Sequence, residues 1–359
     1  MNYSLVEILE LSEGFIDPNL INEQSFAHIK TIAKYFSRRL CRNFLFECRL
    51  NDSCSSVDFS IHLTPKALGN SPDIFNCFLS ESVIADPVWQ QIINFYQNWH
   101  ARFQNLGLGI KSLGLEFDED QYLAIPPIPS IFFNLRKFPD ETPTNPLPGT
   151  SKSQQKNIFV HALTQLLGQP LLPKVEKNLW TCIDRLPSGA RIFLVATMLS
   201  RNLNVIRFCL TGIQYQDIHS YLHGIGWTGS LTKVDELVST VFEYTNTVVL
   251  HIDVGQKILP KLGFECYFPK EYKNSSLLDF VSFLVKHNLC SPAKRDSLLS
   301  WQGRFHGHLY ESLLPYIFIK ELSHIKLVYQ SNSHLEAKGY LSLIYRDLND
   351  NLAVEKSII

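Results

Sequence analysis

The sequence predicts an α+β fold in which five helix-hairpin repeats close a ten-stranded antiparallel barrel, with the helices outside and a polar lumen. Five segments alternate apolar and polar residues with a period of two, and a segment of helical character precedes each of them. An open sheet of ten strands would expose two edges, and closure removes them. We expect a single barrel domain over residues 1–359, with repeats at about 25–64, 86–138, 154–213, 214–268 and 275–345.

The first three repeats carry the alternation in the N-terminal part of the chain. In VDFSIHL, Asp58 and two further polar residues alternate with apolar ones, and in LGLEFD the apolar positions are separated by Glu116. Arg136 follows the apolar run of PSIFFNLRKF, and Arg207 stands between Ile206 and Phe208 in the third hairpin. Each strand therefore has one apolar face and one polar face.

The fourth repeat shows the pattern over VVLHIDVGQKILPKLGFECYF, residues 248–268. His251 and Asp253 share one face of the first predicted strand, and Lys261, Glu265 and Tyr267 share one face of the second. Gly263 lies between Lys261 and Glu265 on the second strand and is expected to leave room for a ligand to approach the backbone.

The fifth repeat, 321–345, places Lys326 on the polar face of one strand and Lys338 and Tyr340 on the polar face of the next. If helices cover the barrel, the apolar faces point outward at them and all of these polar groups line the lumen.

Composition excludes several classes of protein. A net charge of -1 and a pI near 6.9 give no basic surface for nucleic acid or for a membrane. No apolar run approaches the roughly 18 residues of a membrane span, and the N-terminal MNYSLVEILELSEG lacks the basic start of a signal peptide. The 8 cysteines are scattered without CxxC pairs, so we expect reduced thiols in a cytoplasmic protein.

Over about residues 25–345, the repeat architecture and strand patterning resemble the ABBA-type aromatic and peptide prenyltransferases, also called the PT-barrel family. The resemblance implies a ten-stranded barrel whose chamber holds an allylic diphosphate and an aromatic or peptide acceptor, and a reaction of natural-product biosynthesis. It implies a catalytic carboxylate on an early strand, cations on later strands that grip the diphosphate, and tyrosines that shield the allylic cation.

Carried onto this chain, the resemblance implies catalytic roles for Asp58 and Glu116. The residues that it places at the donor are Arg136, Arg207, Lys261, Lys326 and Lys338 as cations and Tyr267 and Tyr340 as shields. Asp253 and Glu265 are expected to orient these cations or a metal. Fixed cations stabilise the charge that grows on a departing diphosphate, and an aromatic wall stabilises an allylic cation and excludes water.

The balance of charge departs from the family, whose later strands are rich in Lys, Arg and Tyr. The predicted lumen holds seven acidic residues and six basic ones: Glu47, Asp58, Glu116, Asp118, Asp253, Glu265 and Glu336 against Arg49, Arg136, Arg207, Lys261, Lys326 and Lys338. The resemblance implies that no cofactor is required. The carboxylates leave open a Mg²⁺ ion that bridges to the diphosphate, ion pairs that fix the lysines, or a cationic substrate.

Two other functions remain open on the residues alone. A cyclase or hydrolase of natural-product biosynthesis would use Asp253 and Glu265 as acid and base. A non-catalytic protein would bind a peptide in the chamber or at an exposed edge. Convergent Arg and Lys would favour the prenyltransferase, a close carboxylate pair the other enzyme, and a filled interior the peptide-binding protein.

Overall fold

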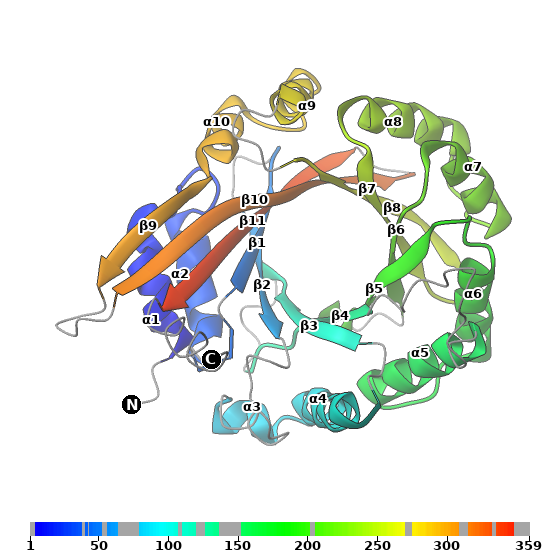
Figure 1. Ribbon diagram of the computed structural model, residues 1–359, viewed down its shortest axis with the longest axis horizontal. Helices are drawn as coiled ribbons and strands as arrows, with labels where there is room; N and C mark the ends of the chain where they lie inside the picture. The colour runs from blue at the N-terminus through cyan, green and yellow to red at the C-terminus, as the bar shows by residue number, and fades with distance from the viewer. Residues whose placement is uncertain are drawn as a thin grey trace, which may run out of the picture.

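The computed structural model describes residues 4–37, 40–41, 43–51, 56–63, 79–106, 110–119, 126–135, 152–201, 205–269, 275–308, 315–331 and 335–347. Its centre is a closed antiparallel barrel of ten strands with helices around it (Figure 1). The fold predicted from the alternation is therefore confirmed.

The ten barrel strands follow one another in sequence around the ring. They are β1 (Asn43–Arg49), β2 (Val57–Leu63), β3 (Ile110–Phe117), β4 (Ser130–Leu135), β5 (Arg191–Thr197), β6 (Ile206–Thr211), β7 (Thr247–Val254), β8 (Ile258–Tyr267), β10 (Pro315–Gln330) and β11 (Glu336–Asp347). The ring closes where β11 pairs with β1, as in Glu47 opposite Tyr340 and Arg49 opposite Lys338. The predicted hairpins all occur, and the last one is longer than expected.

One strand was not predicted. β9 (Gly303–His308) pairs with the first half of β10, on the side where β8 pairs with its second half. It extends the sheet outside the ring (Figure 1). Its two glycine and two histidine residues carry little of the apolar alternation by which the other strands are recognised.

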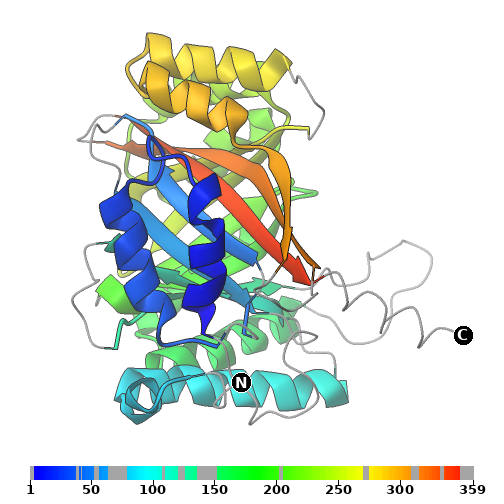
Figure 2. The same ribbon diagram turned by 90° about the vertical axis from the view of Figure 1, so that its left-hand side faces the viewer.

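Helices surround the barrel, and Figure 2 shows α1 and α2 over its outer surface. The α-helices among the described residues are α1 (Leu5–Ser12), α2 (Glu23–Ala33), α3 (Glu81–Ala85), α4 (Pro87–Leu106), α5 (Lys152–Leu167), α6 (Pro173–Asp184), α7 (Tyr215–Gly224), α8 (Leu231–Tyr244), α9 (Ser275–Lys286) and α10 (Pro292–Ser300). No helix in the described part of the chain has the length and apolar character needed to cross a membrane.

The core lies between the helices and the outer face of the barrel, as the alternation predicts. Phe133 of β4 contacts Phe95 of α4, with ring centroids 6.1 Å apart, and Phe208 of β6 lies 5.9 Å from Phe159 of α5. Phe264 is fully buried among outward-facing partners on the neighbouring strands. The helices therefore stabilise the barrel by burying the apolar side of each strand.

Helix starts follow local sequence signals. The Asn22 side chain accepts a hydrogen bond from the Ser25 amide at the start of α2, and Asp86 accepts bonds from the Val88 and Trp89 amides at the start of α4. The predicted helical stretch 154–180 is two helices, α5 and α6, because Gly168 takes a positive φ of 65° after α5 and a proline begins α6.

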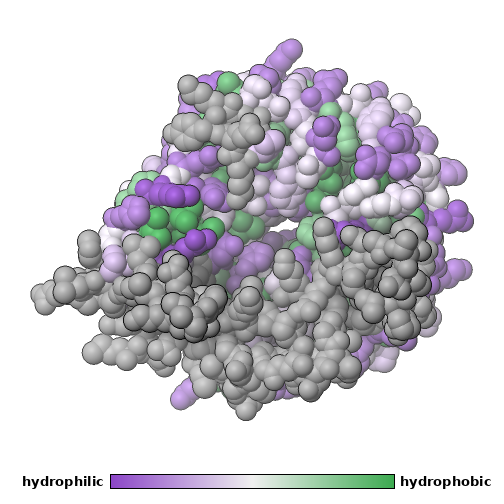
Figure 3. Space-filling model, viewed as in Figure 1, coloured by the Kyte–Doolittle hydropathy of each residue, from purple (hydrophilic) through white to green (hydrophobic). Residues whose placement is uncertain are grey.

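A β-bulge in β10, between Leu322 and His324, changes which side chains face the lumen. Before the bulge, Ile317 and Ile319 lie opposite inward residues of β11, and after it His324 and Lys326 do so. Glu321, also before the bulge, lies opposite Ser342, so the bulge moves the inward face of β10 from odd-numbered to even-numbered residues. The same view as Figure 1, drawn as a space-filling surface, is hollowed at the centre of the barrel (Figure 3).

Candidate active site

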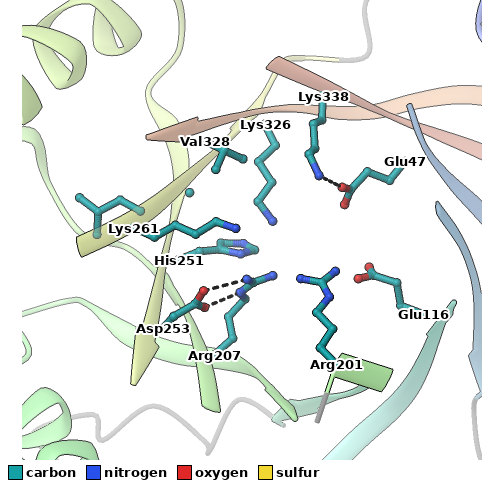
Figure 4. Close-up of a pocket in the computed structure, with 12 residues that line it drawn as sticks. Glu47, Glu116, Arg201, Arg207, His251, Asp253, Lys261, Lys326, Val328 and Lys338 are labelled. Atoms are coloured by element: carbon teal, nitrogen blue, oxygen red, sulfur yellow. Dashed lines mark hydrogen bonds and ion pairs between the residues drawn. The ribbon is translucent and has the colours of Figure 1, made fainter. Parts of the chain in front are cut away.

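A pocket lies in the polar part of the lumen. Five cationic side chains line it, Arg201, Arg207, Lys261, Lys326 and Lys338, together with the carboxyl groups of Glu47, Glu116 and Asp253 and the imidazole of His251 (Figure 4). The pocket is partly open to solvent, and its cavity volume is about 30 Å³.

Strand register brings these groups together. Arg207 on β6 lies opposite Asp253 on β7, and Lys326 on β10 lies between Glu265 on β8 and Lys338 on β11. Directly opposed like charges repel each other in a sheet. The Lys326 and Lys338 pair therefore needs anions nearby.

Asp253 pairs with Arg207 inside the barrel. The Arg207 Nε and a terminal nitrogen donate to the two Asp253 oxygens, at 2.7 and 2.9 Å, and both residues are buried. Burial disfavours the charged carboxylate, but Arg207 outweighs burial and lowers the pKa of Asp253 to about 2. This bidentate pair fixes the orientation of the guanidinium, and the role of Asp253 at a donor site stays a prediction.

Glu47 holds the cations of the last hairpin. Its carboxylate accepts hydrogen bonds from the Lys338 ammonium and from the Tyr340 hydroxyl, and Lys326 Nζ lies 3.4 Å from that hydroxyl. Burial raises the pKa of Glu47, but the charges of Lys338 and Lys326 outweigh it, and the pKa falls to about 2. Tyr340 thus joins this charge network as well as the aromatic wall.

Arg201 was not predicted as a site residue. It comes from a short 3-10 turn, Leu199–Arg201, between β5 and β6, and Asp118 accepts hydrogen bonds from its guanidinium and from Ser200 Oγ. Asp118 raises the pKa of Arg201. The alternation of strand residues could not reveal Arg201, because it lies in a loop where no period assigns an inner face.

Lys261 differs from the three cations with fixed carboxylate partners. Neither Lys261 nor Lys326 forms an ion pair with any residue that the structure describes. Burial lowers the pKa of Lys261, and the charge of Arg207 lowers it further, to about 8. Lys261 and Lys326 therefore add positive charge beyond the paired carboxylates on this side of the pocket.

Glu116 and Asp58 lie on the other side of the lumen, and both have raised pKa values. Burial and then the charges of Glu47 and Asp58 raise the pKa of Glu116 to about 8. Burial and then Glu47 raise the pKa of Asp58 to about 7. Glu116 lines the pocket, whereas Asp58 does not and accepts a hydrogen bond from the Glu119 amide at 2.9 Å.

Glu265 lies close to two histidines and accepts a hydrogen bond from a tyrosine. One of its oxygens lies 2.7 Å from His251 Nε2 and 3.5 Å from His324 Nε2, and the other accepts a bond of 2.9 Å from Tyr267. His324 lies between Tyr267 and Tyr340, with ring centroids 4.8 and 4.1 Å away. Tyr267 and Tyr340 therefore share an aromatic row with His324, which was not predicted as a site residue although it lies two positions before Lys326 and on the same face of β10.

Arg136 lies outside the described residues, and its predicted place at the site stays a prediction. Among the residues that the structure does describe, no group of three or more His, Cys, Asp or Glu is placed to hold a metal ion. The structure brings the remaining predicted residues to the lumen, in a cationic part on β6–β11 and an acidic part on β1–β3.

No protein-family model and no curated protein matches the sequence. Among solved structures, 5-dimethylallyltryptophan synthase from Streptomyces coelicolor is similar at 10% identity and a TM-score of 0.47, covering 95% of this chain and 98% of that one. The prenyltransferase PriB in its apo form aligns at 11% identity and a TM-score of 0.49, over 94% of both chains. A 6-dimethylallyl tryptophan synthase aligns at 11% identity and a TM-score of 0.48, over 95% of this chain and 93% of that one.

Proposed function

We propose that this protein is a prenyltransferase, which moves an allylic group from its diphosphate to an aromatic or peptide side-chain acceptor. The observation that carries the proposal is the convergence of five cations on one pocket, of which Lys261 and Lys326 have no described carboxylate partner. Such an excess of fixed positive charge favours a small, highly charged anion.

The paired carboxylates support this assignment. The predicted lumen was nearly neutral, yet Asp253, Asp118 and Glu47 are each committed to one cation, Arg207, Arg201 and Lys338. They hold these groups in fixed orientations, so little reorganisation is needed when charge grows on the leaving diphosphate.

Glu116 is the proposed proton acceptor for the nucleophile. It faces the pocket and has an elevated pKa, as a general base working near neutral pH requires. The C1–O bond of the donor breaks with its electron pair on the diphosphate, the acceptor atom bonds to C1, and the acceptor proton passes to Glu116. The aromatic row of Tyr267, His324 and Tyr340 would stabilise the allylic cation and exclude water.

The alternative enzyme, with Asp253 and Glu265 as acid and base, has less support. Asp253 is engaged by Arg207 through two hydrogen bonds, and Glu265 by His251 and Tyr267. The low pKa of each carboxylate leaves neither as a proton donor at neutral pH.

Calorimetric titration with inorganic diphosphate and with dimethylallyl and geranyl diphosphate tests the proposal, each with and without Mg²⁺. Replacing Lys326→Met removes a charge-assisted contact and should weaken binding about 10- to 100-fold. Lys257→Met is the matched control, because Lys257 is exposed in the β7–β8 turn and should not affect binding. If the unmodified protein binds none of these ligands in either condition, the prenyltransferase proposal is wrong.

A further inference from the structure

His251 occupies an unusual place for a histidine, within the cationic cluster. It lines the pocket between Lys261, Lys326 and Arg207 (Figure 4), and its side chain is 5% exposed. Its Nε2 lies 2.7 Å from Glu265 Oε1 but outside hydrogen-bond geometry, and its Nδ1 is buried without a hydrogen-bond partner among the described residues. A buried polar atom with no partner is costly unless a ligand or a change of state satisfies it.

Gly263 makes this placement possible. It lies opposite His251 on the neighbouring strand, and a Cβ atom at Gly263 would come within 3.1 Å of His251 Cβ and 2.9 Å of Lys326 Cε. Gly263 also lines the pocket, and these two side chains lie where its Cβ atom would be. The missing Cβ lets an imidazole and an ammonium lie together at the pocket.

We propose that His251, oriented by Glu265, donates a proton to the diphosphate as it leaves the allylic carbon. This inference rests on the proposed function and adds a catalytic residue to it. Glu265 is then a positioning residue, because it acts on the diphosphate only through the imidazole.

The charges around His251 explain how its protonation depends on the donor. The groups that face it are Lys326 and His324 from β10, Arg207 and Cys209 from β6, Asp253 from its own strand, and Lys261 and Glu265 from β8. Burial and Lys326 outweigh Glu265 and lower the pKa of His251 to about 4, so among these protein groups the imidazole is neutral at pH 7. A bound diphosphate offsets the nearby cations and favours the imidazolium, which takes its proton from solvent.

With the proton from His251, the atoms and electrons of the chemical step balance. The C1–O bond breaks and its electron pair stays on oxygen, the imidazolium N–H bond breaks, and the proton goes to the diphosphate. The acceptor supplies the electron pair of the new bond to C1, and its own proton goes to Glu116. Both residues return to their starting states when solvent exchanges protons after product release.

Proton uptake on binding tests the first half of the inference. Titration of inorganic diphosphate at about pH 6.5, in buffers that differ in ionisation enthalpy, measures the protons taken up. Lys261 has a pKa of about 8 and is already charged at that pH, so it adds little to the signal. His251→Gln should take up about one proton fewer than the unmodified protein. His223→Gln is the matched control, because His223 is exposed near the end of α7 and does not line the pocket, and it should keep the uptake.

Leaving-group dependence tests the catalytic half. Dimethylallyl esters of methylenediphosphonate and of difluoromethylenediphosphonate release a weaker and a stronger acid, and ³¹P NMR follows their cleavage with water as the nucleophile. His251→Gln should slow cleavage of the methylene ester at least about tenfold more than that of the difluoromethylene ester, because the stronger acid needs less protonation. Glu265→Gln should show the same trend to a smaller degree.

The outcomes separate the two proposals. Equal slowing of both esters in His251→Gln, or unchanged proton uptake, overturns the role of His251 while diphosphate binding and cleavage by the unmodified protein uphold the prenyltransferase. Absence of binding and cleavage in the unmodified protein overturns both.

Discussion

Two carboxyl groups on the acidic side of the lumen, Glu116 and Asp58, were both predicted as catalytic, and their surroundings now distinguish them. Glu116 lines the pocket and has no described hydrogen bond, whereas Asp58 is 3% exposed and is engaged by the Glu119 amide. A proton acceptor must reach the substrate, so we assign that role to Glu116.

Glu116→Gln should lower turnover about 10²- to 10⁴-fold and leave diphosphate affinity largely intact. A general base works when ionised, so the rate of the unmodified protein should rise as pH increases toward the Glu116 pKa of about 8. The pH profile of prenyl transfer measures this rise, which Glu116→Gln should abolish. Asp58→Asn should keep it, and the reverse result would assign the base to Asp58.

Among the structural elements, the β7–β8 hairpin depends on one glycine for its inner surface. Gly263→Ala would place a methyl group against His251 Cβ, an atom that moves only with its backbone, and against the end of Lys326. Overpacking of this kind costs about 1–3 kcal/mol. Urea unfolding should show that loss, and calorimetry should show weaker diphosphate binding.

Gly14→Ala is the control for this prediction, since a Cβ at Gly14 meets no atom within 4 Å. It should change stability by less than about 0.5 kcal/mol. If Gly263→Ala is equally neutral, the close packing of His251 and Lys326 over this glycine is wrong.

The inward-facing residues of a strand could be predicted from the sequence only where inward and outward residues alternate regularly along it. Regular alternation identified both faces of β2, β7 and β8, and with them Asp58, Asp253 and Lys261. The bulge before His324 shifts the alternation by one residue, so the inward Ile317 and Ile319 could not be distinguished from outward residues. Arg201 lies in a turn that has no period at all, and only tertiary contact with Asp118 brings it to the pocket.

At the scale of the whole molecule, the buried carboxyl groups of the lumen make the stability of the fold depend on pH in opposite directions. Asp253 and Glu47 have lowered pKa values, so their contribution to stability is complete above their unfolded values and is lost as pH falls toward about 2. Asp58 has a raised pKa, so its contribution is complete below its unfolded value of 3.8 and is lost as pH rises through about 7. A buried carboxyl group with a raised pKa, such as that of Asp58, therefore lowers stability at neutral pH and above, the pH range in which a general base is ionised and active.

Asp58→Asn should therefore raise the melting temperature at pH 8 by about 2 °C or more, because the amide needs no ionisation and can still accept the Glu119 hydrogen bond. At about pH 4, below or near the unfolded pKa, the two proteins should melt at similar temperatures. Thermal unfolding followed by circular dichroism across this pH range measures the difference. A constant difference at all pH values would mean that Asp58 has no raised pKa in the folded protein.

The closure of the barrel between β1 and β11 has a consequence for how the protein is made. Glu47 bonds to Lys338 and Tyr340, partners 291 and 293 residues away in sequence. A ribosome adds about 5–20 residues per second, so Glu47 is synthesised many seconds before Lys338 and Tyr340, the residues that pair with its carboxylate. During that interval β1 has an unpaired edge, and the helices and hairpins between can assemble only an open, curved sheet. The last strand to be translated thus completes the wall, and no nascent chain contains the cationic pocket before that strand pairs.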